Sequence, residues 1–322
     1  GPRGASAGGA ATAAVDPTRA QWPLADLLEE DPLFLIEDKR SGEEVIRRLT
    51  DPCDACECQA IVNWLRMAAR PLAMDRMGTR VVQQALEKVQ GDGKMAWLRE
   101  LSPHTQALFD SPHGNFVLTK AVEVMPSTLL GDFIAKVLEM GPLVVARHKF
   151  ACRFLERLVE HCSERELRVV LDEIVADADN LCTHQYGNFV VQTILEHGSL
   201  ERKQAVLDKV LTKDLSYLAM HRRASHVVQK VLECSDKVGQ NKVIQVLLEA
   251  DTPTSLVEVA CNFYGAFVLM TVAGLRPPPD KVGEVKSVLA ECKSELGGSL
   301  NGLRVAEKFG LEVEAHGDLD VP

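Results

Sequence analysis

A stretch of similar sequence recurs along this chain at a nearly constant interval. The most regular copy, GNFVVQ at 187–192, has a small residue, then a polar residue, a planar residue, two aliphatic residues and a Gln. The copies start at Gly42, Gly78, Gly114, Ala151, Gly187, Ala224, Gly265 and Gly302, with successive separations of 36, 36, 37, 36, 37, 41 and 37 residues. A period of this length is typical of solenoids and propellers, in which each repeat packs against its sequence neighbours.

Each repeat has the pattern of helices and lacks the alternation of strands. Within residues 163–198, Ser163 and Glu166 form a capping box ahead of a helix whose apolar residues recur at helical spacing. A short segment around Leu181 follows, and another helix begins after Gly187. Aromatic residues make up only 5% of the chain, which favours helices over sheets. We therefore predict an all-α solenoid of about eight three-helix repeats.

The five residues after each small residue divide between two faces of the predicted helix. Residues three and four are apolar and are predicted to face the core, whereas residues one and five lie one turn apart with residue two beside them. In the six inner repeats the one/five pairs are Thr79/Gln83, Asn115/Thr119, Cys152/Glu156, Asn188/Gln192, Ser225/Gln229 and Ala266/Met270. Residue two is Arg80, Phe116, Arg153, Phe189, His226 or Phe267.

Position two is therefore planar in all six inner repeats. A planar side chain can stack on a nucleobase, and a polar pair one turn apart can hydrogen-bond the edge of that base. A core role would explain the three Phe residues, but it does not explain Arg80, Arg153 and His226 in the same register. The recurrence predicts a ladder that binds single-stranded nucleic acid, one base per repeat.

Charge is unevenly distributed along the chain. The net charge of −10 by itself argues against a non-specific nucleic-acid binder. Ten-residue windows around the six inner small residues nevertheless contain only two acids, Asp75 and Glu156, against nine basic residues. These are Arg76, Arg80, Lys120, Lys149, Arg153, Arg157, Arg222, Arg223 and Lys230. We predict a basic face suited to phosphates; the alternative is that charge simply alternates over the helix surfaces.

Four copies resemble repeats of the Pumilio (PUF) family: DRMGTRVVQQALEKV, HKFACRFLERLVEHC, HQYGNFVVQTILEHG and MHRRASHVVQKVLECS. The resemblance extends over roughly residues 42–310 and is strongest from 72 to 234. It implies an armadillo-like, right-handed crescent of eight three-helix repeats with degenerate terminal repeats. It also implies that single-stranded RNA binds the concave face, antiparallel to the chain.

In that family the one/five pair selects the base. The resemblance implies that Asn with Gln reads uracil, that Ser, Cys or Thr with Gln reads adenine, and that Glu at position five reads guanine. Read from the sixth repeat back to the second, the pairs predict the core 5′-AUGUA-3′, which contains UGUA. The fourth base is the weakest, because Asn115/Thr119 keeps the Asn and lacks the Gln.

The outer repeats depart from the family pattern. Ala266/Met270 has lost both polar groups, although Phe267 can still stack. The first repeat offers Glu43, Glu44 and Arg47, and the last offers Leu303, Arg304 and Glu307; both are interpreted as caps. Whether the first, seventh and eighth repeats contact RNA stays open.

Composition divides the chain into a repeat domain and two tails. Residues 1–20 are rich in Ala and Gly and nearly free of acid, which predicts a disordered tail, with a transit peptide as the alternative. Residues 21–310 form the predicted Pumilio-homology repeat domain, with inner repeats at about 60–275 and capping repeats at both ends. Residues 311–322 are polar and are expected to fray.

No nucleotide-binding, metallohydrolase or nucleophile motif is present, so the sequence indicates a binding protein, not an enzyme, and no cofactor. Cys53, Cys56 and Cys58 lack a second Cys/His pair at zinc spacing, and we interpret them as a loop without a metal. The nine scattered Cys indicate reduced thiols in an intracellular protein.

The predicted function is sequence-specific binding of single-stranded RNA, in mRNA 3′ untranslated regions, for post-transcriptional regulation of translation in the cytoplasm. We expect a monomer, with no membrane association and with repression or decay factors on the convex face. One alternative is a PUF-like ribosome-biogenesis factor of low sequence specificity, in the nucleus or nucleolus. The other is an α-solenoid scaffold for a protein partner.

Overall fold

The computed structural model describes residues 22–51, 54–249 and 253–316. Within these ranges the chain forms α-helices and two short 3-10 helices, and no strand. Contacts divide it into two compact bodies, residues 1–124 (the N-terminal body) and residues 125–322 (the C-terminal body). The prediction of an all-α solenoid is confirmed. The predicted tail of residues 1–20 lies outside the described residues.

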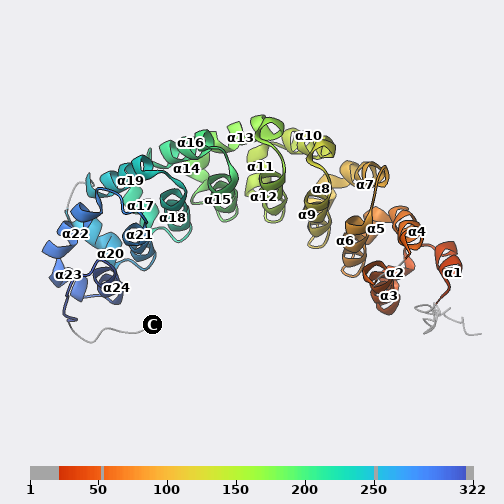
Figure 1. The fold of residues 1–322 in the computed structure, drawn as a ribbon, viewed down its shortest axis with the longest axis horizontal. Coiled ribbons are helices and arrows are strands. Elements are labelled where there is room, and N and C mark those ends of the chain that lie inside the picture. The colour runs from red at the N-terminus through yellow and green to blue at the C-terminus, as the bar shows by residue number, and fades with distance from the viewer. Residues whose placement is uncertain (1–21, 52–53, 250–252, 317–322) are drawn as a thin grey trace, which may run out of the picture. The chain divides into compact units, whose positions relative to one another are not determined.

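The N-terminal body contains three repeats of three helices each (Figure 1). They are α1 Leu24–Glu29, α2 Phe34–Glu37 and α3 Lys39–Thr50; α4 Ala55–Arg66, α5 Ala69–Met74 and α6 Gly78–Lys88; and α7 Gly93–Leu101, α8 Thr105–Asp110 and α9 Gly114–Val124. A 3-10 helix at Ser102–His104 joins α7 to α8.

The C-terminal body contains five further repeats, preceded by a 3-10 helix at Ser127–Leu129. The first three are α10 Gly131–Met140, α11 Pro142–Arg147 and α12 Ala151–His161; α13 Glu164–Ala176, α14 Ala178–Leu181 and α15 Gly187–His197; and α16 Leu200–Val210, α17 Leu215–Met220 and α18 Ala224–Cys234. The last two are α19 Lys237–Glu249, α20 Pro253–Cys261 and α21 Phe263–Gly274; and α22 Val282–Glu291, α23 Lys293–Gly297 and α24 Leu300–Lys308.

Within each body, the third helix of a repeat packs against the third helix of the next repeat. In the N-terminal body α3, α6 and α9 form one layer, and in the C-terminal body α12, α15, α18, α21 and α24 form another (Figure 1). We call these eight the inner helices. All eight contain the small residue of the sequence repeat, so the sequence period corresponds to one inner helix.

Residues three and four of the inner helices form the core, as predicted. The exposed fraction of each side chain is at most 1%. The pairs are Val81–Val82, Val117–Leu118, Phe154–Leu155, Val190–Val191, Val227–Val228 and Val268–Leu269.

The small residue is required where the inner helix crosses the short helix before it. A Cβ atom on Gly78 would lie 2.3 Å from the carbonyl oxygen of Leu72, and one on Gly265 would lie 2.3 Å from that of Val259. Backbone atoms cannot move aside as a side chain can, so Gly is required at these two positions. Ala151 and Ala224 occupy the same position in two other repeats, where both are fully buried.

The residue three places before the small residue caps the inner helix. In seven repeats its side chain accepts a hydrogen bond from the backbone N–H of the small residue, at 2.8–3.2 Å. The seven caps are Asp75, Ser111, His148, His184, His221, Asn262 and Ser299. Such caps satisfy N–H groups that a helix start leaves without a partner. The capping box predicted at Ser163 and Glu166 is also confirmed.

The inner helix of the first repeat begins at Lys39, before Gly42, because Asp38 caps it. Two expectations need correction or restriction. Residues 311–316 have no regular structure, but the N–H of His316 donates to the carbonyl of Gly297 at 3.0 Å. A frayed tail therefore remains an expectation only for residues 317–322, which lie outside the described residues. Among the described cysteines seven are free thiols, whereas Cys58 is disulfide-bonded, which departs from the expectation that all are reduced.

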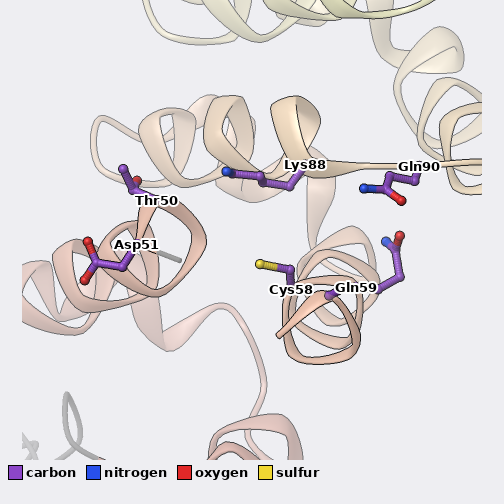
Figure 2. A pocket seen from close by; sticks show the side chains of 7 residues that line it. Thr50, Asp51, Cys58, Gln59, Lys88 and Gln90 are labelled. Carbon is purple, nitrogen blue, oxygen red and sulfur yellow. The ribbon is translucent and has the colours of Figure 1, made fainter. Parts of the chain in front are cut away.

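A pocket of about 330 Å³ lies between the ends of α3 and α6 and the start of α4 (Figure 2). It is lined by Thr50, Asp51, Ala55, Cys58, Gln59, Lys88 and Gln90. Lys88 and Asp51 are the charged residues of this lining, and no residue of the one-two-five triplets belongs to it. In the described part of the chain, no helix combines the length and apolar character that a membrane span requires.

Candidate nucleic-acid interface

The side chains at position one are buried, and several are anchored to the backbone. The exposed fractions are 5% for Thr79, 4% for Asn115, 1% for Cys152, 3% for Asn188, and 1% for Ser225 and Ala266. The amide of Asn115 donates to the carbonyl of Ser111 at 2.8 Å, and that of Asn188 donates to the carbonyl of His184 at 2.8 Å. The hydroxyl of Thr79 donates to the carbonyl of His113 at 3.0 Å. Position one is thus fixed in orientation before any ligand binds.

Position five lies at the surface beside it. Gln83, Gln192 and Gln229 are half-buried, and each donates from Nε2 to the carbonyl oxygen of position one, at 3.1–3.3 Å. Nε2 of Gln192 also donates to Oδ1 of Asn188 at 3.0 Å. The structure therefore brings the residues of these pairs together, as the helical spacing predicted.

Glu156 differs from the other residues at position five. It is 9% exposed, its Oε2 accepts from Nη1 of Arg153 at 2.8 Å, and its Oε1 is buried without a hydrogen-bond partner. Burial raises the pKa of this carboxyl, against the opposing effect of Arg153. A buried carboxylate oxygen without a donor is costly, so this site is suited to a ligand that supplies N–H groups.

The planar side chains at position two are exposed. Phe116, Phe189 and Phe267 have exposed fractions of 53%, 38% and 43%, and Arg80, Arg153 and His226 are exposed too. The interpretation of these three Phe residues as core is therefore excluded. Large exposed aromatic groups in a regular row are unusual on a solvated surface and mark a contact surface.

Two of these planar groups already stack on each other. The guanidinium carbon of Arg153, on α12, lies 4.5 Å from the centroid of the Phe189 ring, on α15. In the seventh repeat, Phe267 lies beside Phe263, with ring centroids 5.8 Å apart. Phe263 is 54% exposed and was not predicted as a site residue. It stands two places before Gly265, outside the five residues that define the triplet.

The basic face is smaller than the sequence predicted. Lys120 forms ion pairs with Glu87 at 3.0 Å and Glu123 at 3.1 Å. Lys230 does so with Glu196 at 2.7 Å and Glu233 at 3.0 Å, and the hydrogen bond to Glu196 raises its pKa further above the usual range. Each of these lysines pairs with one acid of its own inner helix and one acid of the preceding inner helix. These acids lie in the C-terminal halves of the helices, outside the ten-residue windows of the sequence analysis. These ion pairs link neighbouring repeats and remove these cations from the basic face.

The other basic residues of the predicted face fall into two groups. Arg153 and Arg157 form ion pairs with Glu156 and Glu160, but five cations at or near the starts of inner helices form none with any described residue. These are Arg76, Arg80, Lys149, Arg222 and Arg223. Their positive charge is concentrated at the starts of the inner helices, beside the position-two side chains.

Ion pairs within the first repeat neutralise its carboxylates. Arg47 Nη2 lies 2.6 Å from Glu44, and Nε of Arg48 lies 3.3 Å from it, and the hydrogen bond from Arg47 lowers the pKa of Glu44. Lys39 pairs with Glu43 at 3.6 Å. Glu43 and Glu44 are therefore balanced by three cations, Lys39, Arg47 and Arg48. In the eighth repeat Arg304 and Glu307 are exposed.

Sequence reasoning missed the capping histidines. His148, His184 and His221 accept two backbone N–H groups each at Nδ1, so Nδ1 must be unprotonated. Burial, with a smaller effect of nearby Arg residues, lowers the pKa of His184 and of His221. The signal was present in the sequence, because every repeat from the second on has a hydrogen-bond acceptor three places before the small residue.

The fold and the recurring triplet define a helical repeat protein with a row of exposed planar groups on its inner helices. A sequence profile described as the Pumilio-family RNA binding repeat matches residues 70–102, 143–175, 179–211 and 216–248. The chain therefore contains Pumilio-family (PUF) repeats. The four matches are centred on α6, α12, α15 and α18, whose residues at position five are Gln or Glu. The repeats that the sequence marks as divergent at position five, with Thr119 and Met270, lie outside the matched ranges.

Individual proteins support the same family. A Pumilio domain-containing protein of Schizosaccharomyces pombe is 20% identical over 254 residues, which cover 79% of this chain. The chain spans only 37% of that relative's own length. The solved structure of PUF-8 in complex with PBE-RNA superposes with a TM-score of 0.82 at 19% identity, over 92% of this chain and 86% of that one. The Puf4 RNA-binding domain bound to an HO endonuclease RNA 3′ UTR sequence superposes with a TM-score of 0.76 at 18% identity, over 88% and 90%.

Proposed function

We propose that this chain binds single-stranded RNA sequence-specifically through its inner helices. The observation that supports this most is the repeated geometry on α6, α9, α12, α15 and α18. In each of these helices an exposed planar side chain lies beside a polar side chain at position five. The planar groups would stack on bases, at about 1–3 kcal/mol each, and the polar groups would hydrogen-bond the base edges.

The proposed core is 5′-AUGUA-3′. In the C-terminal body, Ser225/Gln229 would read adenine, Asn188/Gln192 uracil, and Glu156 beside Cys152 guanine. In the N-terminal body, Asn115/Thr119 would read uracil weakly and Thr79/Gln83 adenine. The RNA would run antiparallel to the chain, and the free cations Arg76, Lys149 and Arg222 would contact its phosphates.

Glu156 gives the proposed guanine position its chemical basis. Its buried Oε1 has no donor within the described protein, and guanine offers N1–H and N2–H groups on its Watson–Crick edge. Uracil offers one N–H and adenine one amino group on that edge, so neither supplies the two neighbouring donors that a carboxylate accepts. We therefore expect guanine to be the most strongly selected base of the core.

The biological role that follows is post-transcriptional regulation of mRNA. The related Puf4 domain is bound to a 3′ UTR sequence, and we propose that this chain also acts on mRNA 3′ untranslated regions, in the cytoplasm and as a monomer. Repression or decay factors would bind the outer helices. In this role the chain is a binding protein without catalytic activity.

Selection from random RNA with the purified chain tests this proposal. We expect enrichment of UGUA-containing sequences with a strongly selected guanine. Enrichment without that guanine would refute the assignment of Glu156. In the matched variant Gln192→Ala, selection for uracil should weaken at its own position only; equal weakening of every RNA would exclude edge reading.

Two other functions predict different results in filter binding. A ribosome-biogenesis factor of low specificity would bind UGUA-containing RNA and polyadenine alike, and would be found in the nucleus or nucleolus. A protein scaffold would bind neither. The free cations and the exposed stacking row favour RNA over a protein partner.

A further inference from the structure

Five glutamates occupy the same position on five inner helices. They are the ninth residue after the small residue in each helix that is proposed to read a base, namely Glu87, Glu123, Glu160, Glu196 and Glu233. In the other three inner helices the ninth residue is Asp51, Gly274 or Leu311. We call the five the position-nine glutamates. Their recurrence in the base-reading helices alone suggests a role in RNA binding.

The position-nine glutamates lie on the same helix face as the base-reading side chains. Position nine is four residues after position five and seven after position two, and residues at these spacings share one face of a helix. The exposed fractions of the side chains range from 22% for Glu160 to 49% for Glu233. A bound strand would therefore have these carboxylates beside it, about 6 Å further along each helix than position five.

Cations neutralise the position-nine glutamates only in part. Three basic residues at position six pair with them: Lys120 with Glu87 and Glu123, Arg157 with Glu160, and Lys230 with Glu196 and Glu233. Five carboxylates against three cations leave an excess of negative charge. Hydrogen bonds from Gln84 and Lys120 lower the pKa of Glu87, so this carboxyl is ionised at neutral pH.

The unpaired cations lie at the other end of the same face. Lys149 and Arg222 stand two places before the small residue in the C-terminal body, as Arg76 does in the N-terminal body. None of the three forms an ion pair with a described residue. The face is therefore positive where the inner helices start and negative about two turns further on, with the base-reading pairs between.

We propose that the position-nine glutamates confine the RNA backbone to the starts of the inner helices and so disfavour RNA whose bases do not match. The inference rests on the proposed RNA binding. Stacking and edge contacts hold a matching strand over positions two and five. A non-matching strand is held by phosphate attraction alone, so it can shift along the helices toward the carboxylates.

The separation is short enough for this repulsion to act. Charges at a protein surface interact over a Debye length of about 8 Å at physiological ionic strength, and position nine is only about 6 Å beyond position five. The glutamates therefore repel a strand that moves by a single helical turn, whereas a strand in the matching position pays a smaller penalty. The result is a selective weakening of non-matching RNA.

Fluorescence anisotropy with AUGUA and AAAAA, which have equal length and charge, tests the proposal. The double variant Glu196→Gln/Glu233→Gln removes two carboxylates and releases Lys230. We expect it to bind AAAAA about fivefold more tightly, as for two unit charges at about 6–8 Å in water, and AUGUA less than twofold more tightly. For AAAAA, the slope of log affinity against log salt should steepen by about 0.7, because the released Lys230 reaches one more phosphate.

Glu173→Gln/Glu201→Gln is the matched control, because it changes the net charge equally at two exposed residues of the outer helices α13 and α16. It should leave the ratio of the two affinities unchanged. Glu160→Gln is a second test variant. Glu160 pairs with Arg157 of its own helix, so this change breaks no ion pair between repeats, and it should tighten AAAAA about twofold. Thermal melting of each variant checks that the fold is intact.

The outcomes separate this inference from the proposed function. If the wild type prefers AUGUA but the inner and outer double variants behave alike, only net charge matters; the inference is then wrong and the proposed function stands. Equal tightening of AUGUA and AAAAA in the inner variant would also overturn the inference, since the glutamates would then oppose every RNA. If the wild type does not distinguish the two RNAs, the proposed function fails and this inference with it.

Discussion

The guanidinium of Arg153 on α12 stacks on the ring of Phe189 on α15, 4.5 Å from its centroid. These are the position-two groups of two successive repeats. A base between them would need about 7 Å, two contact distances of roughly 3.5 Å each. The stack must therefore open when a base enters, and the protein groups exchange one stacking partner for another.

We predict that Arg153→Ala weakens binding of AUGUA about 5- to 30-fold, or roughly 1–2 kcal/mol. Arg153→Lys keeps a cation for Glu156 but loses the planar group, so it should recover only part of this loss. Equilibrium binding measures both. Arg165→Ala, an exposed change on the outer helix α13, is the control. Wild-type affinity in Arg153→Ala would rule out a stacking role.

Thr119→Gln should strengthen the weakest position of the core. Asn115 and Asn188 each donate a 2.8 Å hydrogen bond to the backbone carbonyl of the residue four places before them in the chain. Only Asn188 has a Gln beside it, so the substitution should create a second uracil pair. We expect a gain in discrimination of up to about 1–3 kcal/mol, measured as the affinity ratio of AUGUA to AUGCA. Thr119→Leu, which adds volume without an amide, should give no gain.

Binding of guanine should depend on pH through Glu156. Only the ionised carboxylate accepts two N–H groups, and burial raises the pKa of this carboxyl. Affinity for AUGUA should therefore fall on acidification sooner than the titration of an ordinary Glu would predict. Glu156→Gln should bind less tightly at neutral pH and should lose this Glu-specific part of the pH dependence.

Ionisation of Glu156 favours guanine binding, but it should lower the stability of the fold. Because the folded protein binds this proton more readily than the unfolded chain does, ionisation of Glu156 lowers stability as pH rises through its folded pKa. Glu156→Gln removes the costly buried charge together with its ion pair to Arg153. Urea unfolding at neutral pH should therefore show a loss of stability no larger than the loss of that ion pair explains. A large additional loss would contradict the assignment of a costly buried charge.

His184 should stabilise the start of α15 in a pH-dependent way. Its Nδ1 accepts from the N–H groups of Tyr186 and Gly187, so His184→Ala should cost about 1 kcal/mol in unfolding free energy. Burial, then Arg147 and Arg223, lowers the pKa of His184 from 6.5. Its contribution is therefore complete above about pH 6.5 and is lost as pH falls through the folded pKa.

His184→Asn is the matched variant, because Asn262 caps α21 through the same two N–H positions at 2.9 and 3.0 Å. It should retain the cap at neutral pH and become more stable than wild type at acid pH. Urea unfolding at two pH values measures this difference. A constant difference between the two proteins would show that the histidine does not titrate as a cap.

Gly78→Ala should destabilise the N-terminal body by about 1–3 kcal/mol, since its Cβ would meet the Leu72 backbone at 2.3 Å. Gly187→Ala should cost less, because the nearest atom, 2.6 Å away, is the end of the Leu181 side chain. Gly131→Ala is the control: it meets nothing within 4 Å and should stabilise α10 by about 0.4–1 kcal/mol. Chemical unfolding ranks the three, and any other order would contradict the close-approach explanation.

The inner helices were predictable because their signals are local. The recurrence of the small residue places each inner helix, and the 3.6-residue period puts Val190 and Val191 in the core. The capping box at Ser163 needs only residues three places apart. The same helical spacing predicted that the residues at positions one and five lie beside each other.

The charge distribution was not predictable at the same level. Whether Lys120 and Lys230 belong to a basic face depends on acids of the preceding inner helix, 33 and 34 residues away in sequence. The burial of Asn188 and the stack of Arg153 on Phe189 likewise depend on how one repeat packs on another. Counting charges within a window cannot detect such contacts.

The sequence by itself determined the repeat, the helical class and the register of the candidate base-reading side chains, because a periodic pattern is recorded in each repeat separately. The tertiary structure decided which polar groups remain available to a ligand. It buries position one, neutralises Lys120 and Lys230, leaves Oε1 of Glu156 without a donor among the described residues, and groups Lys39, Arg76 and Arg80 around one pocket. The physical reason is that availability is set by contacts between repeats, and these form only when the chain is folded.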